Sequence, residues 1–205
     1  MALDIKPTRS ELIKLKKRIK LAVAGHKLLK KKRDGLILDF FEVLKEAKTV
    51  RKDLTEQYKE SMVKINKARV VETDLKLKSI AMAVKEKPFV QLETKNIMGV
   101  QVPKIQSSAV QKHFMDRGYG IIGSSAAVDE AAIAFEKLVE RVIKAAEVET
   151  AMKKLLLEIE KTKRRVNALE FAVIPKMNKT KSFISMRLEE MERENIFRLK
   201  RIKKK

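Results

Sequence analysis

One stretch of the chain, residues 12–54, carries apolar side chains at alternating spacings of three and four residues. Eleven of its thirteen positions at this spacing are apolar, in a chain that is 44% apolar overall. A repeat of 3.5 residues turns one narrow stripe of side chains toward a partner helix, which is the sequence pattern of a coiled coil. The stretch therefore predicts a long helix that needs a long partner. Its thirteen positions are Leu12, Leu15, Ile19, Ala22, His26, Leu29, Arg33, Leu36, Phe40, Val43, Ala47, Val50 and Leu54.

The partner is predicted in the C-terminal half, where a second stripe has mostly the same spacing and two additional steps of four residues. Such steps locally unwind a supercoil, so we expect a nearly straight coil. The first stripe is predicted to continue past Leu54 with a slip, through Tyr58, Met62 and Ile65. The second stripe comprises Val148, Met152, Leu155, Ile159, Thr162, Val166, Leu169, Val173, Met177, Thr180, Ile184, Leu188 and Met191. The seam residues on which the pairing depends most are Leu15, Ile19, Leu29, Leu36, Phe40, Met152, Ile159, Val166 and Leu169.

The ends and interruptions of the two helices are also predicted. Thr8 and Glu11 have the spacing of a capping box, and the next proline after Pro7 is Pro88, so the first helix is expected over about residues 8–85. Each glycine inside it, Gly25 or Gly35, costs about 1 kcal/mol relative to alanine, so it either admits a close neighbour or is simply tolerated. Helix is expected to resume near Ala126 after a serine cap at Ser124 or Ser125, and Pro175 is expected to bend the second helix.

Between the helices the apolar spacing changes from helical to alternating, which predicts a short β-hairpin over residues 89–106. The alternation does not locate the turn, although Asn96 and Gly99 lie between the two runs. Residues 107–126, which include Gly118, Gly120 and Gly123, are predicted to form a loop. The hairpin residues that we expect to contact helices or a partner are Phe89, Val90, Leu92, Ile97, Met98, Val100 and Val102.

These predictions define a fold that is dominated by α-helix. Residues 1–87 and 126–205 are expected to form a long antiparallel two-helix coiled coil, and residues 88–125 the hairpin and loop insert. In this arrangement both termini lie at one end of a rod-shaped unit, and the insert lies at the other end.

The formal net charge of +21 is concentrated near the termini. Residues 8–33 contain eleven Lys or Arg and one acid, and residues 193–205 contain seven Lys or Arg and one acid, so these two segments carry about +16. If the helices pair, one strongly basic tip results, and it suits nucleic-acid phosphates, an acidic membrane surface or an acidic protein cavity. The basic residues that we expect to contact a partner are Arg9, Lys14, Lys16, Lys17, Arg18, Lys20, Arg198, Lys200 and Arg201.

The sequence offers little for catalysis or ligand binding. It has no cysteine and only two histidines, and it has no phosphate-binding loop, dinucleotide fingerprint or metalloprotease motif. His26 and Arg33 interrupt the first stripe. His26 is expected to be a hydrogen-bonded residue that sets the register, and Arg33 is expected to act in the same way or to pair with an acid of the partner helix. No catalytic residue, metal or cofactor is therefore expected. The chain has no apolar run near 18 residues and no signal-peptide core, which favours a cytosolic location.

Six apolar residues lie outside the stripe of the first helix, more than a two-stranded seam can cover. They require a third element or a partner surface. These residues are Ile13, Leu21, Leu28, Ile37, Phe41 and Leu44.

Four segments, in order along nearly the whole chain, resemble the D subunit of the archaeal and bacterial A/V-type ATP synthases. They are PTRSELIKLKKRIKLAVAGHKLLKKKRD at 7–34, TKNIMGVQVP at 94–103, YGIIGSSAAVDEA at 119–131 and EIEKTKRRVNALEFAVIP at 158–175. Ala24 and Gly35 depart from the pattern of that family, in which a basic and a larger residue are usual.

The resemblance implies a non-catalytic rotor shaft in the central stalk. In the family, the paired terminal helices enter a hexamer of A and B subunits, the small F subunit binds the shaft, and the far end docks into a funnel-shaped subunit on the membrane rotor ring. It also implies a cytoplasmic protein that is peripheral to the cell membrane, without nucleic acid and without direct membrane insertion. Two other classes stay open from the residues themselves: a prefoldin-like coiled-coil chaperone and a basic coiled-coil protein that binds nucleic acid.

Overall fold

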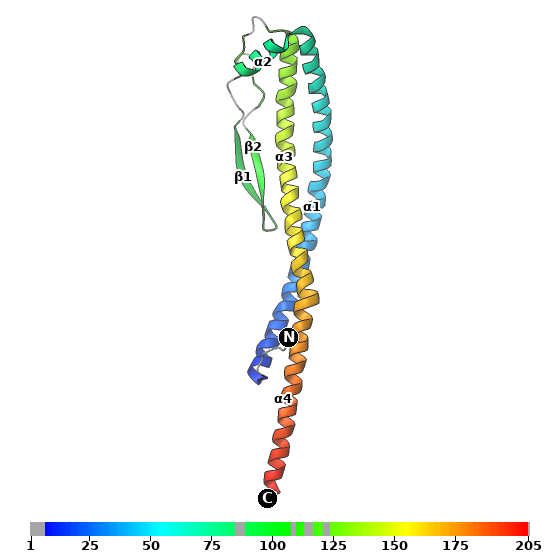
Figure 1. Ribbon diagram of the computed structural model, residues 1–205, viewed down its shortest axis with the longest axis vertical. Helices are drawn as coiled ribbons and strands as arrows, with labels where there is room; N and C mark the ends of the chain where they lie inside the picture. The colour runs from blue at the N-terminus through cyan, green and yellow to red at the C-terminus, as the bar shows by residue number, and fades with distance from the viewer. Residues whose placement is uncertain (1–6, 85–88, 108–109, 113–116, 121–123, 205) are drawn as a thin grey trace. The chain divides into compact units, whose positions relative to one another are not determined.

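The computed structural model describes residues 7–84, 89–107, 110–112, 117–120 and 124–204. The chain forms helices α1 (Arg9–Val71) and α2 (Asp74–Ala83), strands β1 (Val90–Ile97) and β2 (Val100–Ser107), helix α3 (Ala126–Asn167), the π-helix η2 (Ala168–Val173) and helix α4 (Ile174–Lys203) (Figure 1). The predicted fold class, long paired helices with one antiparallel hairpin between them, is confirmed. The predicted boundary at Lys87–Pro88 and the loop residue Gly123 lie outside the described residues, and the division at residues 87 and 125 stays a prediction.

The chain divides into two units, and α1 contributes to both. The terminal unit comprises residues 1–36 and 159–205, and the central unit comprises residues 37–158. In the terminal unit Arg9 pairs with Glu192, and His26 lies near Glu170. In the central unit Arg51 Nη2 lies 2.6 Å from Glu149 Oε1, and Arg141 Nη1 lies 3.7 Å from Asp53 Oδ2. Residue numbers rise on one helix as they fall on the other, so the helices in each unit are antiparallel.

Thr8 caps the start of α1 as predicted. The Glu11 amide donates to Thr8 Oγ1 at 3.3 Å, and the Leu12 amide donates to the Thr8 carbonyl at 3.0 Å. The Glu11 carboxylate pairs with Lys14 Nζ at 3.0 Å. The cap satisfies amides that would otherwise lack a partner in the first turn of the helix.

Burial follows the two predicted stripes closely. Every one of the thirteen positions from Leu12 to Leu54 is at least half-buried, and Leu36 is completely buried. On the other helix Leu155, Val166 and Ile184 are at most 1% exposed, whereas two positions of the stripe, Val173 and Met191, are exposed. Thr162 and Thr180 are also buried in the second stripe.

Of the three positions predicted after Leu54 with a slip, Ile65 is half-buried and packs against the cluster of Ala68, Val128 and Ala131, but Tyr58 and Met62 are wrong. Tyr58 is 52% exposed and Met62 is 36% exposed, whereas Ser61 and Ala68 are completely buried. The alternation of three and four residues thus continues without a slip, through small residues instead of large apolar ones. Ser61 Oγ lies 2.8 Å from the Gln57 carbonyl and 3.1 Å from the Ala134 carbonyl, so its one hydrogen can be donated along its own helix or across to α3.

Small side chains explain this part of the seam. Ala131 and Ala134, on α3, are buried like Ser61 and Ala68 on α1. Such residues allow two helix backbones to approach more closely than Tyr58 or Met62 would permit. A search for large apolar residues cannot detect this kind of packing, because serine is polar and alanine is small.

The prediction of one helix through residue 85 is also wrong. Helix α1 ends at Val71, Thr73 is extended with φ −71° and ψ 147°, and α2 begins at Asp74. After the break, Leu77 and Ile80 of α2 pack on the cluster formed by Ala68, Val128 and Ala131. This packing covers the end of the α1–α3 pair, which explains why the helix breaks there. The sequence signal was Thr73–Asp74, a cap-type residue before an acid in the first turn.

The structure locates the hairpin turn at Met98–Gly99. Both residues have positive φ, 47° and 86°, as a two-residue type I′ turn requires. The Gly99 amide donates to Asn96 Oδ1 at 2.8 Å, and Ile97 pairs with Val100. Strand β1 therefore continues to Ile97 and β2 begins at Val100, although the alternating apolar residues alone did not locate the turn.

Pro175 has no backbone N–H to donate, and it lies in α4 directly after a wider helical turn. It follows the π-helix Ala168–Val173, where the Ile174 amide donates to the Leu169 carbonyl five residues earlier. The wider turn lies where the second stripe has two successive spacings of four residues, Leu169 to Val173 to Met177. Eight residues over two turns are about four per turn, which is more than the 3.6 residues per turn of an α-helix. A π-helix thus precedes Pro175, and the expected bend of the helix there stays a prediction.

Gly25 provides a test of stability. A methyl group at this position would meet no atom within 4 Å, so the glycine is tolerated and does not serve a close approach. Gly25→Ala is expected to raise the free energy of unfolding by about 1 kcal/mol, because alanine loses less backbone entropy in a helix. Urea denaturation followed by circular dichroism measures this change.

Gly118→Ala is the matched control. Gly118 has φ 82°, a backbone conformation that side chains with a Cβ disfavour. This substitution is expected to lower the free energy of unfolding by about 1 kcal/mol. A destabilised Gly25→Ala protein would mean that this segment of α1 lies closer to another group than the structure shows.

Candidate partner-binding site

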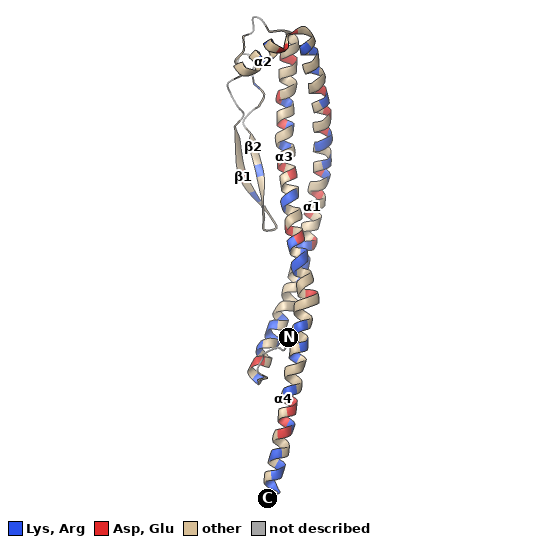
Figure 2. Cartoon of the chain, viewed as in Figure 1, with Lys and Arg blue, Asp and Glu red and all other residues tan. Residues whose placement is uncertain are grey.

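The antiparallel pairing in the terminal unit brings the basic segments of the two chain ends into one unit. Arg9 on α1 pairs with Glu192 on α4, although 183 residues separate them in sequence. Lys and Arg are dense on both segments of this unit (Figure 2). The nine basic residues expected to contact a partner are all exposed. They form the basic surface: Arg9, Lys14, Lys16, Lys17, Arg18, Lys20, Arg198, Lys200 and Arg201.

Few acids neutralise the basic surface. Lys14 pairs with Glu11, and Arg198 Nη2 lies 3.8 Å from Glu194 Oε2. Within the described part of the chain, Lys16, Lys17 and Lys20 form no salt bridge. Exposed ion pairs are worth only about 0–1 kcal/mol each, so these pairs contribute little to stability.

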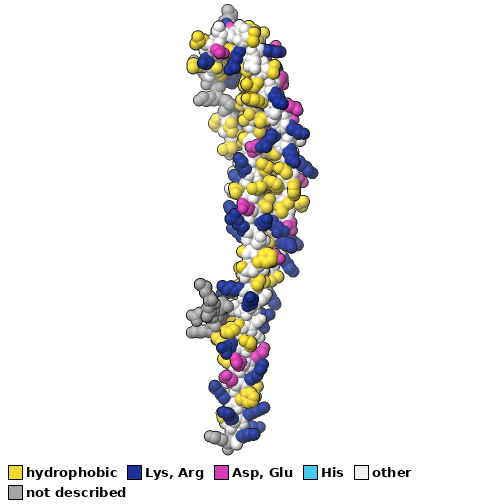
Figure 3. Space-filling view, turned by 45° about the vertical axis from the view of Figure 1, so that its right-hand side comes forward, with side chains coloured by type: hydrophobic (Ala, Val, Ile, Leu, Met, Phe, Trp, Pro, Cys, Tyr) yellow, Lys and Arg dark blue, Asp and Glu magenta, His cyan; other side chains and the backbone are white. Residues whose placement is uncertain are grey.

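Apolar side chains are exposed beside the charges of the terminal unit. Near the C-terminal end of α4 the exposed fractions are 53% for Ile196, 67% for Phe197, 65% for Leu199 and 71% for Ile202. The space-filling view shows hydrophobic side chains scattered among Lys and Arg in this way (Figure 3). Of the six apolar residues outside the first stripe, Ile13, Leu21 and Leu28 of this unit are more than half exposed, and so is Phe41 of the central unit. A surface that is both basic and apolar suits contact with a protein.

The two polar interruptions of the first stripe behave differently. His26 is 16% exposed at its side chain, and its Nε2 lies 3.4 Å from Glu170 Oε2 across the pair but makes no hydrogen bond to the described residues, so the expected hydrogen bond that would set the register is not present. Arg33 pairs with Asp34, its neighbour on the same helix, at 2.7 Å. The expected ion pair between Arg33 and the partner helix is therefore wrong, because an adjacent carboxylate is within easier reach.

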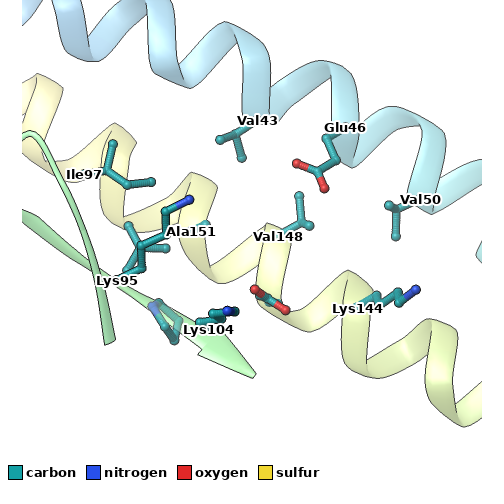
Figure 4. Close-up of a pocket in the computed structure, with 12 residues that line it drawn as sticks. Val43, Glu46, Val50, Lys95, Ile97, Lys104, Lys144, Val148 and Ala151 are labelled. Carbon is teal, nitrogen blue, oxygen red and sulfur yellow. The ribbon is translucent and has the colours of Figure 1, made fainter. Parts of the chain in front are cut away.

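In the central unit the hairpin lies beside the helix pair and encloses a hollow of about 350 Å³ (Figure 4). Val43 and Val50 of α1 and Val148 of α3 line it from the helix side, and Lys95 and Ile97 line it from β1. Of the seven predicted hairpin residues, Val100 and Val102 are buried and Ile97 is half-buried. The other four, Phe89, Val90, Leu92 and Met98, are exposed.

A buried polar cluster in the central unit was not predicted from the sequence. Arg117 is 5% exposed, and its Nε and Nη2 donate to the two carboxylate oxygens of Glu136 at 3.1 and 3.2 Å. Its Nη1 lies 3.7 Å from Asp129 Oδ1, which also accepts from Tyr119 Oη at 2.7 Å. The cluster ties the segment before α3 to that helix. Residues 117–120 have the composition of a loop, so the sequence carried no signal for burial.

The environment of this cluster shifts two pKa values. Burial raises the pKa of Tyr119, and the hydrogen bond to Asp129 raises it further. Burial alone would lower the pKa of Arg117, but hydrogen bonds to Tyr119 and Glu136 outweigh it and raise the pKa. On the surface of the same unit, the hydrogen bond from Arg51 lowers the pKa of Glu149. The raised pKa values keep Arg117 charged and Tyr119 protonated and neutral at neutral pH, which suits a structural role.

A second hollow, of about 250 Å³, lies against the cluster and is mostly apolar. Val110, Tyr119, Phe135 and Val139 line it together with Arg117. Among the described residues, no group of three or more histidines or acids is placed to hold a metal ion. None of the described helices is both long enough and apolar enough to cross a membrane.

The fold defines the class of protein first: an antiparallel helix pair with a hairpin, whose terminal unit carries exposed basic and apolar residues. The family model for the ATP synthase D subunit matches residues 11–204, so the chain belongs to that family. This confirms the resemblance noted in four segments of the sequence. The match over the whole chain does not favour the prefoldin-like or nucleic-acid-binding alternatives.

Several relatives are similar over nearly their whole length. The D subunit of the A-type ATP synthase from Methanococcoides burtonii is 61% identical over 203 residues, which cover 99% of this chain and 98% of the relative. The D subunit of the A-type ATP synthase from Methanosarcina acetivorans is 60% identical over 200 residues, covering 98% and 96%. The corresponding protein from Halorubrum lacusprofundi is 54% identical over 203 residues, covering 99% and 89%.

Tyr119→Phe tests the buried cluster through its pH dependence. The pKa of Tyr119 is raised above its ordinary value of 10.0, so the folded protein holds this proton more tightly than the unfolded chain. The resulting stability is fully present below pH 10 and is lost as the pH rises through the raised pKa. The difference in free energy of unfolding between wild type and variant, about 1 kcal/mol at neutral pH, should therefore shrink above pH 10.

Denaturation at pH 7 to 11 measures this difference. The contributions of other titrating groups to the free energy of unfolding cancel, because both proteins share those groups. Tyr58→Phe is the control, since Tyr58 is 52% exposed. A difference for Tyr119→Phe that is independent of pH would contradict the raised pKa.

Proposed function

We propose that this chain is the central-stalk component, the rotor axle, of an A/V-type ATP synthase. Its rotation would couple ATP synthesis or hydrolysis in the catalytic head to ion movement through the membrane rotor. The observation that carries the proposal is the family match over residues 11–204, together with relatives that are D subunits of A-type ATP synthases. The chain is a component of the complex and is not its catalytic head.

Three partners follow from this proposal. The terminal unit enters the hexamer of A and B subunits, the small F subunit binds along the shaft, and a funnel-shaped subunit above the membrane ring receives the other end. The protein is then cytoplasmic and peripheral to the membrane, and it needs no cofactor of its own. The basic and apolar surface of the terminal unit supports the first contact, because its nine basic residues are exposed and mostly unneutralised.

The basic surface is proposed to act as a diffuse electrostatic bearing within the head. A rotating shaft cannot keep fixed partners, and exposed ion pairs are individually weak. A spread field attracts an acidic lining at every angle without trapping the shaft at one of them. Paired long helices also suit the transmission of torque.

Reversal of charge on the basic surface tests this role. Substitution of Lys16, Lys17, Lys20 and Lys200 by glutamate changes the charge by eight units without breaking a described salt bridge. Assembly with the head is expected to weaken at least about tenfold near 0.1 M salt, because attraction becomes repulsion, and the loss should be smaller at higher salt. Reconstitution with purified A and B subunits, followed by gel filtration and titration, measures this effect.

The matched control reverses four exposed lysines of the central unit: Lys48, Lys52, Lys59 and Lys67. This control should bind the head with nearly wild-type affinity. Wild-type chain is expected at one copy per hexamer. Full assembly by the terminal-unit variant would exclude the electrostatic bearing, and failure of the wild-type chain to join the head would exclude the proposed function.

Deletion of the hairpin tests a second contact, with the F subunit or with the head. Val90 and Ser107 are paired neighbours on the two strands, so a short Gly-Ser link can replace residues 90–107. The deletion is expected to change the rate of ATP hydrolysis by the reconstituted complex or the affinity for the F subunit, at least about threefold. If neither quantity changes, while α-helix content stays normal, the hairpin has no such contact.

A further inference from the structure

The hairpin packs against the helix pair only near its turn. Val100 and Val102 are buried and Ile97 is half-buried. Lys95 and Lys104 lie further along the same face of the strands, and both are exposed. Side chains on one face of a strand recur at every second residue, so these five residues share the face that Ile97 and Val102 turn toward the helices. Close packing on the helices therefore ends where the two lysines begin.

The hollow of about 350 Å³ between the hairpin and the helix pair has charges of opposite sign on its two sides (Figure 4). On the hairpin side these charges are Lys95 and Lys104. On the helix side they are Glu46 of α1 and Glu147 of α3, together with Lys144 of α3. Two lysines of the hairpin thus lie across the hollow from two acids of the helix pair.

The charges around the hollow are not paired with one another. Among the residues that the structure describes, none of these five side chains makes a salt bridge or a hydrogen bond. Elsewhere in the same unit a base and an acid on different helices do pair, with Arg51 Nη2 at 2.6 Å from Glu149 Oε1. Opposite charges attract each other over a range of about 10 Å at 0.1 M salt. The attraction across the hollow therefore pulls the hairpin toward the helices.

We propose that the hairpin is a strap with a second, closed position, in which it pivots about its turn until Lys95 and Lys104 pair with Glu46 and Glu147. A segment with few buried apolar contacts moves at a low cost in free energy, and the hairpin has such contacts only near its turn. Closure also removes water from the apolar walls of the hollow, which adds to the pairing. Exposed ion pairs are individually weak, so the open and the closed positions are both populated.

Lys144 competes with the hairpin for the same acids. It lies three residues before Glu147 on α3, the spacing at which two side chains of a helix are neighbours. A change of rotamer lets Lys144 pair with Glu147, which leaves the hairpin without that partner and favours the open position. Removal of the Lys144 charge is therefore expected to favour closure.

Closure shortens the distance by which the hairpin projects from the helix pair. Five residues separate Val102 from Ser107 along β2, a length of roughly 17 Å, so a small rotation about the turn moves Ser107 by several ångströms. The salt concentration sets the balance between the two positions, because screening weakens the pairing. The strap is a property of the chain itself and does not depend on the proposed function.

The test measures the position of the hairpin in the full-length chain. The chain contains no cysteine, so introduced cysteines carry spin labels at chosen sites only. Ser107→Cys at the end of β2 and Ala146→Cys on α3 replace exposed residues that do not line the hollow. Electron–electron double resonance at 50 mM and 500 mM salt then gives the distances between the two labels. Two populations are expected, and the one at the shorter distance should fall at least about threefold at the higher salt.

Lys95→Glu/Lys104→Glu tests the pairing, because it turns the attraction across the hollow into repulsion. The population at the shorter distance is expected to fall at least about fivefold at 50 mM salt. The further substitution Glu46→Lys/Glu147→Lys restores opposite signs and should restore this population. Lys144→Gln should raise it above the wild-type level. An unfolded hairpin could produce neither of these two gains.

The matched control is Lys52→Glu/Lys59→Glu, an equal change of charge at exposed lysines of α1 that do not line the hollow. It should leave both populations as in the wild type. A single distance that is independent of salt and of every variant overturns the inference. A loss in the hairpin variant that the added helix substitutions do not reverse also overturns it, and so does an equal loss in the control.

Discussion

The packing of one side-chain stripe against another along antiparallel helices is the interaction on which the rest of the structure depends. It buries Leu36, Leu155, Val166 and Ile184 almost completely, while most other helical positions stay in water. Two paired helices have little interior, so each buried side chain matters and there is no second layer to compensate for it. The same geometry leaves the remaining surface free to carry charge and apolar residues for partners.

The seam changes character along its length. Large apolar residues fill it around Leu36 and Leu155, whereas Ser61, Ala68 and Ala134 fill it near the α1–α2 turn. Small side chains bring the backbones close, and the serine hydroxyl then bonds across to the opposite helix. The buried Arg117 cluster adds a second anchor, in which a guanidinium paired with two carboxylates holds the segment before α3 against that helix.

The basic surface of the terminal unit relies on long-range electrostatics. As proposed, it acts through a field that salt screens, because its exposed side chains are individually weak partners. A shaft that turns inside its partner, as proposed, needs attraction that does not hold it at one angle.

The sequence by itself determined the helix pair, the alternating hairpin and the basic ends, because periodicity and charge are local properties of a chain. Four segments of the sequence also indicated the family. Arg33 pairs with the adjacent Asp34, a local contact that the stripe did not indicate. The sequence could not show the continuation of the seam through Ser61 and Ala68, because this depends on how closely two distant segments approach. Only the tertiary structure decided it, together with the burial of Arg117, because each is set by neighbours elsewhere in the chain.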